Sequence, residues 1–132
     1  MNRKKLLKHL VFLMFFIFGL YIMSERFYWY SLLWYFDMIM HFLGGLWVGM
    51  FFLYVFSIEK PVSKNTTLSL KVFLATFLIG ILWEFYELAL DMISRTDFDF
   101  PDTFSDMLFD VLGVLLATFY YLKGTIWMTR QK

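Results

Sequence analysis

The sequence predicts an all-α fold: one integral membrane domain over residues 1–132, built as a four-helix transmembrane bundle. Three observations lead to this prediction. The chain is 61% hydrophobic with 18 Phe, whereas soluble domains are about 45–50% apolar. Four apolar runs have about the 20 residues that a helix needs to cross a bilayer. Lys and Arg are distributed very unevenly among the segments that connect these runs.

The first predicted span covers roughly residues 6–24. A basic stretch, residues 1–9, precedes an unbroken apolar run from Leu10 to Met23. A cleaved signal peptide has the same order of charged and apolar segments and is the alternative interpretation. The bulky run continues through Tyr21 with no small-residue cleavage site after it, so a retained transmembrane helix is favoured.

The second predicted span covers residues 37–57. The connection before it, residues 24–36, is rich in Tyr and Trp, which are typical of the membrane–water interface. The polar segment after it, residues 58–70, contains Pro, Asn, Lys and Thr and is predicted to be a loop.

The third and fourth predicted spans cover residues 71–91 and 106–122. Between them lies a second predicted loop, residues 91–105, in which Asp97 and Asp99 are expected to be ordinary loop acids. A short basic tail follows the fourth span.

Basic residues predict the orientation of the bundle, because Lys and Arg in short loops stay on the cytoplasmic side. With four spans, both termini and the middle loop share one side, which holds ten of the twelve Lys and Arg residues. Arg26 and Arg95 lie on the other side, with most of the acidic residues. The sequence therefore predicts a multi-pass protein of the cell membrane with cytoplasmic termini and an extracytoplasmic active face. The net charge of +1 gives no reason to expect nucleic-acid binding, and the lipid bilayer is the expected partner.

Three helix ends bring polar residues to this outer level. Within each helix end the spacing is three or four residues, which places the side chains on one face. The residues are Asp37 and His41 in the second span, Glu84, Glu87 and Asp91 in the third, and Asp106 and Asp110 in the fourth. Carboxylates within a span are costly unless they are paired or hydrated, so these stripes are candidate functional sites.

So many acidic groups cannot all be charged and dry, so either some hold protons or a cation lies among them. Carboxylates with one His suit Mg²⁺, Mn²⁺, Ca²⁺ or Zn²⁺. The candidate metal ligands are Asp37, His41, Glu84, Glu87, Asp106 and Asp110. In a catalytic version of the site, the general base would be Glu84 or His41. The candidate substrate-binding residues are Asp91, Arg95 and Asp102.

Structural roles are the alternative for several of these residues. Asp37 and Asp106 could cap the N-termini of their helices and interact with the helix dipole. Asp91, at a helix end, could be an ordinary solvated acid. A structural role explains less well the residues that lie a turn or more inside a span, namely His41, Glu84 and Asp110.

Two family resemblances rest on these residues. The run Asp37-Met-Ile-Met-His41-Phe42, followed by Glu84, Arg95 and Asp106-Met-Leu-Phe-Asp110-Val-Leu-Gly113, resembles the VanZ-like family of small membrane proteins. The related YjdF-type membrane proteins resemble the chain at His41-Phe42-Leu43-Gly44-Gly45, Glu84, Glu87, Asp102, Asp106, Met107 and Gly113. Glu87 and Asp110 replace the Gln and Asn that the VanZ-like pattern often has. The resemblance therefore implies a membrane protein of the cell envelope rather than a particular reaction.

The leading functional hypothesis is an outward-facing acidic pocket that binds a divalent cation and, through it, the phosphate of a lipid or cell-envelope precursor. One alternative is a proton- or cation-coupled transporter in which Glu84 and Asp110 exchange ions. Its weakness is the inner half of the spans, where Thr76 and Thr118 are nearly the only polar residues. The other alternative is a non-catalytic assembly partner, whose acids satisfy one another or a second protein.

The polar stripes also predict how the helices pack. The second, third and fourth spans should contact one another, because embedded acids face the interior of a bundle, and the first span should be peripheral. His41, Glu84 and Asp110 should form one cluster, with Asp37 and Asp106 at its outer rim. Five glycines should let helices approach closely: Gly44, Gly45, Gly49, Gly80 and Gly113.

Overall fold

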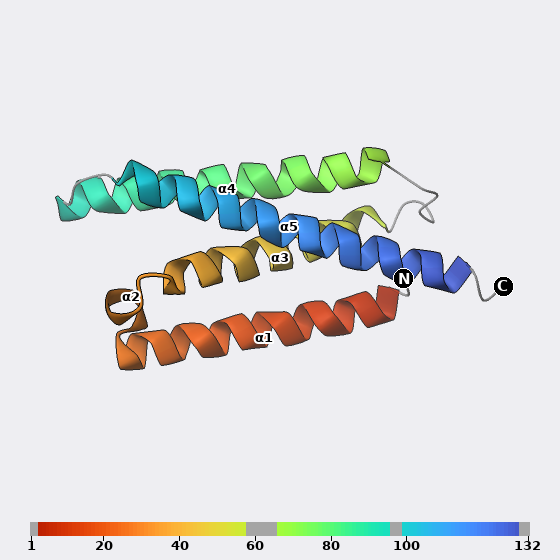
Figure 1. The fold of residues 1–132 in the computed structure, drawn as a ribbon, viewed down its shortest axis with the longest axis horizontal. Helices are drawn as coiled ribbons and strands as arrows, with labels where there is room; N and C mark the ends of the chain where they lie inside the picture. Colours follow the sequence, from red (N-terminus) through yellow and green to blue (C-terminus); the bar gives the residue numbers. More distant parts are fainter. Residues whose placement is uncertain (1–2, 58–65, 96–98, 130–132) are drawn as a thin grey trace.

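The computed structural model describes residues 3–57, 66–95 and 99–129, and within these ranges every regular element is a helix. The elements are α1 (Arg3–Phe27), α2 (Trp29–Leu32), α3 (Phe36–Phe56), α4 (Thr66–Ser94) and α5 (Phe100–Thr129). All but the single turn of α2 are long and apolar enough to cross a membrane. The long helices run side by side in alternating directions (Figure 1). The predicted all-α four-helix transmembrane bundle is confirmed.

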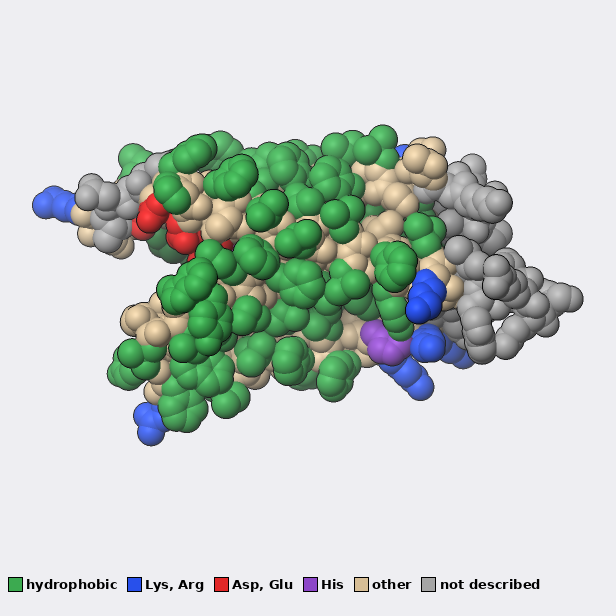
Figure 2. Space-filling model, in the orientation of Figure 1, with side chains coloured by type: hydrophobic (Ala, Val, Ile, Leu, Met, Phe, Trp, Pro, Cys, Tyr) green, Lys and Arg blue, Asp and Glu red, His purple; other side chains and the backbone are tan. Residues whose placement is uncertain are grey.

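The two ends of the bundle differ in charge. We call the end where α1 begins and α5 ends the basic end, because the described Lys and Arg residues lie there, apart from Arg26 and Arg95. The opposite end, where α2 joins α1 to α3, is the acidic end. Figure 2 shows acidic side chains beside a hollow at one end, where basic side chains lie only at the tips, and the His and several basic side chains at the other end. The direction of the bundle across a membrane stays a prediction.

Glycines allow α3 and α5 to pack against each other more extensively than any other helix pair. A Cβ added at Gly45 would collide with the backbone of Asp110. A Cβ added at Gly113 would collide with the backbone at Phe42 and Leu46. The predicted role of these two glycines in close helix approach is therefore confirmed.

The other glycines of the predicted set have three different environments. A Cβ at Gly49 would lie 3.0 Å from a methyl carbon of Val114, so this position also faces α5 closely. A Cβ at Gly80 would lie 2.7 Å from Oδ2 of Asp110, a side-chain atom rather than backbone. A Cβ at Gly44 would meet nothing within 4 Å. The prediction that Gly44 permits close helix packing is therefore wrong, because this face of α3 borders a cavity.

The first long helix is peripheral, as predicted. The backbone of α1 contacts α3 and the short α2, and it does not approach α4 or α5 within the described residues. The indole nitrogen of Trp47 donates a hydrogen bond to the carbonyl oxygen of Leu10, at 3.0 Å. The rings of His9 and Tyr120 pack in a T-shaped arrangement with their centroids 5.7 Å apart. By contrast, α3, α4 and α5 all contact one another, which confirms the predicted three-helix core of the bundle.

The buried apolar residues gather toward the basic end. They include Leu6 and Leu10 at the start of α1, Leu53 near the end of α3, Val72 near the start of α4 and Ala117 in the second half of α5. The buried polar residues of α3 and α5 lie in the halves of these helices nearer the acidic end. They are His41, Asp106 and Asp110. The bundle therefore has an apolar core at one end and a polar cluster at the other.

At the acidic end, α4 and α5 are longer than the sequence predicted. The predicted loop 91–105 is helical up to Ser94 and again from Phe100. Asp99, expected to be an ordinary loop acid, caps α5: its Oδ1 accepts the Asp102 amide at 3.3 Å, and its carbonyl accepts the Thr103 amide. Asp97 lies outside the described residues.

Two residues with positive φ end helices at this level. Tyr28 (φ 56°) separates α1 from α2, so the predicted connection 24–36 contains the last turn of α1 and all of α2. Arg95 (φ 58°) follows α4 directly. A left-handed residue turns the chain out of the helical path, which explains why both helices stop where they do.

Candidate polar cluster at the acidic end

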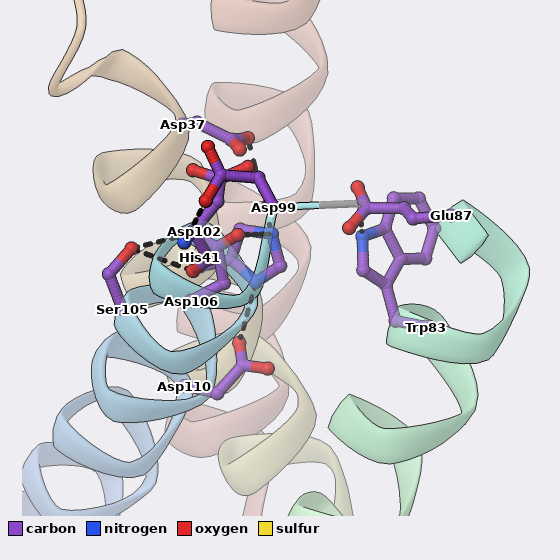
Figure 3. A network of polar contacts seen from close by, with 9 residues as sticks. All are labelled: Asp37, His41, Trp83, Glu87, Asp99, Asp102, Ser105, Asp106 and Asp110. Carbon is purple, nitrogen blue, oxygen red and sulfur yellow. Dashed lines mark hydrogen bonds and ion pairs between the residues drawn. The ribbon is translucent and has the colours of Figure 1, made fainter. Parts of the chain in front are cut away.

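His41 lies at the centre of the polar cluster, in the second turn of α3. Its ring faces three carboxylates, one on its own helix and two on α5 (Figure 3). Nδ1 lies 3.5 Å from Oδ1 of Asp110, and Nε2 lies 3.8 Å from Oδ2 of Asp106. Nε2 also lies 4.0 Å from Oδ1 of Asp37, one turn earlier in α3. The predicted i, i+4 stripes thus converge on one imidazole.

Asp106 is the most deeply buried acid of the cluster, with 1% of its surface exposed. The prediction that it lies at the outer rim is wrong, because α5 begins at Phe100 and continues outward beyond it. For the same reason the capping interpretation of Asp106 is wrong, since Asp99 holds that position. Asp37 retains 32% exposure of its side chain and does lie nearer the surface.

Glu84 and Glu87 approach the cluster from α4. The indole nitrogen of Trp83 donates a hydrogen bond to Oε1 of Glu87 at 2.8 Å, which orients that carboxylate (Figure 3). Oε1 of Glu84 is buried and has no hydrogen-bond partner among the described residues. A buried carboxylate oxygen without a partner is unfavourable, so this atom marks a place where a donor or a cation would be stabilising.

Two groups of donor atoms are close enough together to hold an ion. One ligand atom from each of His41, Glu84, Glu87 and Asp106 lies within 4.8 Å of the others. A second group, under the same limit, contains Asp37, Asp102 and Asp106. Asp106 belongs to both groups. The residues of the two groups come from α3, α4 and α5.

The remaining site candidates lie farther out on the same end of the bundle. Asp102 is exposed in the first turn of α5 and belongs to the second donor group. Asp91 is half-buried one turn beyond Glu87 on α4, and Arg95 is exposed just after that helix. Among the described residues, Asp91 does not enter either donor group.

Sequence reasoning missed the contributions of three aromatic or hydroxyl residues. Tyr30, assigned to an interfacial belt, lies on α2 near Asp37; burial, followed by the negative charge of Asp37, raises the pKa of Tyr30 to about 12. Trp83 was detectable in principle, because it precedes Glu87 by four residues. Thr76 is 2% exposed, and its hydroxyl has no partner in the described part of the chain.

A cavity of about 480 Å³ adjoins the cluster. Residues from all five helices line it, including Asp37, His41 and Gly44 of α3, Thr76 of α4 and Asp110 of α5. Nothing in the sequence pattern predicted this cavity, because it depends on how far α1 stands from α4.

A comparison with models of protein families identifies the family of this chain. A model described as "Predicted membrane protein (DUF2238)" matches residues 1–126. The chain belongs to this family. The match confirms the resemblance to YjdF-type membrane proteins, while the likeness to the VanZ-like family stays a prediction. No curated protein and no solved structure matches the chain.

Proposed function

We propose that this membrane protein binds a divalent cation at its acidic end and, through that ion, the phosphate of a lipid or cell-envelope precursor. The observation that carries the proposal is the four-residue donor group, whose ligand atoms from three helices lie within 4.8 Å of one another. Opposite ligands of Mg²⁺ at about 2.1 Å are about 4.2 Å apart, so small side-chain rotations would bring these four ligand atoms to coordination distance.

The surroundings of His41 support a metal-ligating role. A ligating His usually donates its second ring N–H to a carboxylate, which fixes the orientation of the ring. Asp110 lies 3.5 Å from Nδ1 and can accept that bond, which leaves Nε2 for the ion. Trp83 orients Glu87 in a comparable way, through the bond to one of its two oxygens.

An ion in this group would still have coordination positions open for a phosphate oxygen or a water molecule. Mg²⁺ and Ca²⁺ commonly take six or more oxygen ligands, and the protein group offers four side chains. In a catalytic form of the proposal, Glu84 or His41 would act as the general base. Arg95, exposed at the same end, would contact the phosphate.

The transporter alternative is less well supported by the packing. A path from the cluster to the basic end would have to pass the buried apolar residues Val72, Val114 and Ala117, which line the helix contacts there. Thr76 is the last buried polar residue of α4 in that direction. A cation site that opens at the acidic end requires no such path.

The proposal is tested by metal content and thermal stability of the purified protein. The wild type should retain a divalent cation and be stabilised by about 2.7 kcal/mol at a hundredfold excess over Kd. Glu84→Gln should lose most of this gain, because it removes the charge of one ligand and keeps its shape. Glu25→Gln, an exposed carboxyl of α1 at the same end, is the matched control and should behave as the wild type.

Phosphate binding through the cation is tested in a separate experiment. A lipid phosphomonoester should add stability only while the cation is present, and a chelator should remove that increment. A wild-type protein whose stability is the same with Mg²⁺, Mn²⁺, Ca²⁺, Zn²⁺ or chelator would contradict the proposal. The acids would then form a protonated, hydrogen-bonded network, and the assembly or proton-carrier hypotheses would replace it.

A further inference from the structure

The cavity beside the cluster lies between α1 and α4. These two helices make no backbone contact within the described residues, although both are long and apolar enough to span the membrane. Met14, Ile17 and Phe18 of α1 line one wall, and Ile79 and Trp83 of α4 line the opposite wall. A space between two spanning helices faces the hydrocarbon of the bilayer. The contents of this cavity can therefore come directly from the membrane.

The walls and the inner end of the cavity have different chemistry. Its walls are almost entirely apolar, and its volume falls within the range of about 300–1,000 Å³ that is usual for small-ligand sites. At the α3–α5 side, however, Asp37, His41 and Asp110 reach the cavity. A ligand that fills this shape has an apolar chain and a polar head group.

The charge of the lining residues determines which head group is favoured. The lining contains two carboxylates and one His, and the described residues that line it include neither Lys nor Arg. An anionic head would face these carboxylates with no basic residue to offset them. A positively charged head would pair with them and reduce their mutual repulsion.

Thr76 gives a second, independent indication of a ligand. It lines the cavity, only 2% of its surface is exposed, and its hydroxyl has no hydrogen-bond partner in the described structure. Buried hydroxyl groups nearly always have a partner. A ligand with N–H groups would supply one.

We propose that the cavity between α1 and α4 binds an amphiphile with a primary ammonium head and an apolar chain. The head lies against Asp110, with an N–H group available to Thr76, and the chain lies between α1 and α4. This site differs from the proposed cation site, because Asp110 belongs to neither donor group, although Asp37 at the cavity belongs to the second. The two sites share one residue, His41, which stands between them.

The test uses a long-chain primary alkylamine with a diazirine in its chain, added in trace amounts to phosphatidylcholine vesicles that contain the full-length protein. The same chain with a hydroxyl head and with a sulfate head provides two comparison probes. Chelator is present throughout, so the outcome does not depend on a divalent cation. We expect the amine to label Met14, Ile17 and Ile79 severalfold more than the other probes do. Unlabelled amine should compete. Equal labelling by the three probes, or preference for the sulfate, would overturn the proposal.

Two glycines, each with room for a larger side chain, provide a matched pair of variants. A Cβ at either Gly44 or Gly19 would meet nothing within 4 Å, but only Gly44 lines the cavity. Gly44→Leu should therefore abolish labelling by the amine, whereas Gly19→Leu should leave it unchanged. Labelling of the Gly44→Leu protein at the wild-type level would refute the proposed location.

A third variant tests the head group without filling the cavity. Asp110→Asn keeps the shape of the side chain and removes its charge. Replacing a charge-assisted hydrogen bond by a weaker neutral one should reduce labelling by the amine severalfold. Labelling by the hydroxyl probe should not change. If the Asp110→Asn protein is labelled by the amine as strongly as the wild type, the ammonium assignment is wrong.

Discussion

At the scale of single residues, Asp110 has the most consequential position, because one carboxylate joins three helices. It belongs to α5, its Oδ1 lies 3.5 Å from the His41 ring on α3, and its Oδ2 lies close to Gly80 on α4. A larger residue at position 80 could not leave this carboxylate where it is. The absence of a side chain at Gly80 therefore helps to set the orientation of His41.

Gly80→Ala is expected to change the geometry of the polar cluster while changing the stability of the protein very little. The added Cβ would lie 2.7 Å from Oδ2 of Asp110 and displace the end of that side chain. The change in the free energy of unfolding should be small, because the gain of about 1 kcal/mol in helix propensity from Gly to Ala offsets the cost of displacing the Asp110 side chain. The imidazole nitrogen signals of His41 should shift in ¹⁵N-histidine NMR spectra.

The chain supplies internal controls for this experiment. It contains two His residues, and His9 lies at the basic end, so its signal should not move. Gly19→Ala, at a position with open space, should leave both signals in place. An unchanged His41 signal in Gly80→Ala would show that the Asp110 carboxylate does not lie between Gly80 and His41.

At the scale of helices, the contact between α3 and α5 determines whether the cluster can form. Asp37 and His41 reach Asp106 and Asp110 because small residues bring the two backbones together. Long side chains at this contact would move α5 outward by several ångströms. The glycines are therefore part of the site, although none of them carries a functional group.

Gly113→Ala should be strongly destabilising for this reason. Its Cβ would collide with backbone atoms of Phe42 and Leu46, which cannot move aside as a side chain can. Overpacking costs about 1–3 kcal/mol and outweighs the gain in helix propensity. Denaturant titration in detergent measures the change, with Gly19→Ala as the control. Equal stability of the two variants would mean that α3 and α5 are less closely packed than described.

The helices show which features the sequence could predict. The four spans were predictable because apolar length is a local property, and the polar stripes because their spacing matches the helical period. The depth of Asp106 was not predictable, since it depends on where α5 begins, and Asp99 sets that point by capping it. The cavity at Gly44 was also not predictable, because the spacing between α1 and α4 is a tertiary property.

At the scale of the whole molecule, charge and topology predict one orientation in the membrane. The described basic residues lie at one end, apart from Arg26 and Arg95, and the polar cluster lies at the other. A reporter fused after Lys132 should be cytoplasmic, and one inserted within residues 95–103 should be extracytoplasmic. A cytoplasmic signal from the second reporter would contradict the predicted orientation.

The apolar core and the polar cluster occupy opposite ends of the same four long helices. The apolar side chains toward the basic end hold the helices together by van der Waals packing. The acidic end is held by polar contacts between His41 and the carboxylates of Asp37, Asp106 and Asp110. The helices are therefore expected to separate more readily at the acidic end than at the basic end. Local opening at the acidic end would then expose the polar cluster without unfolding of the whole protein.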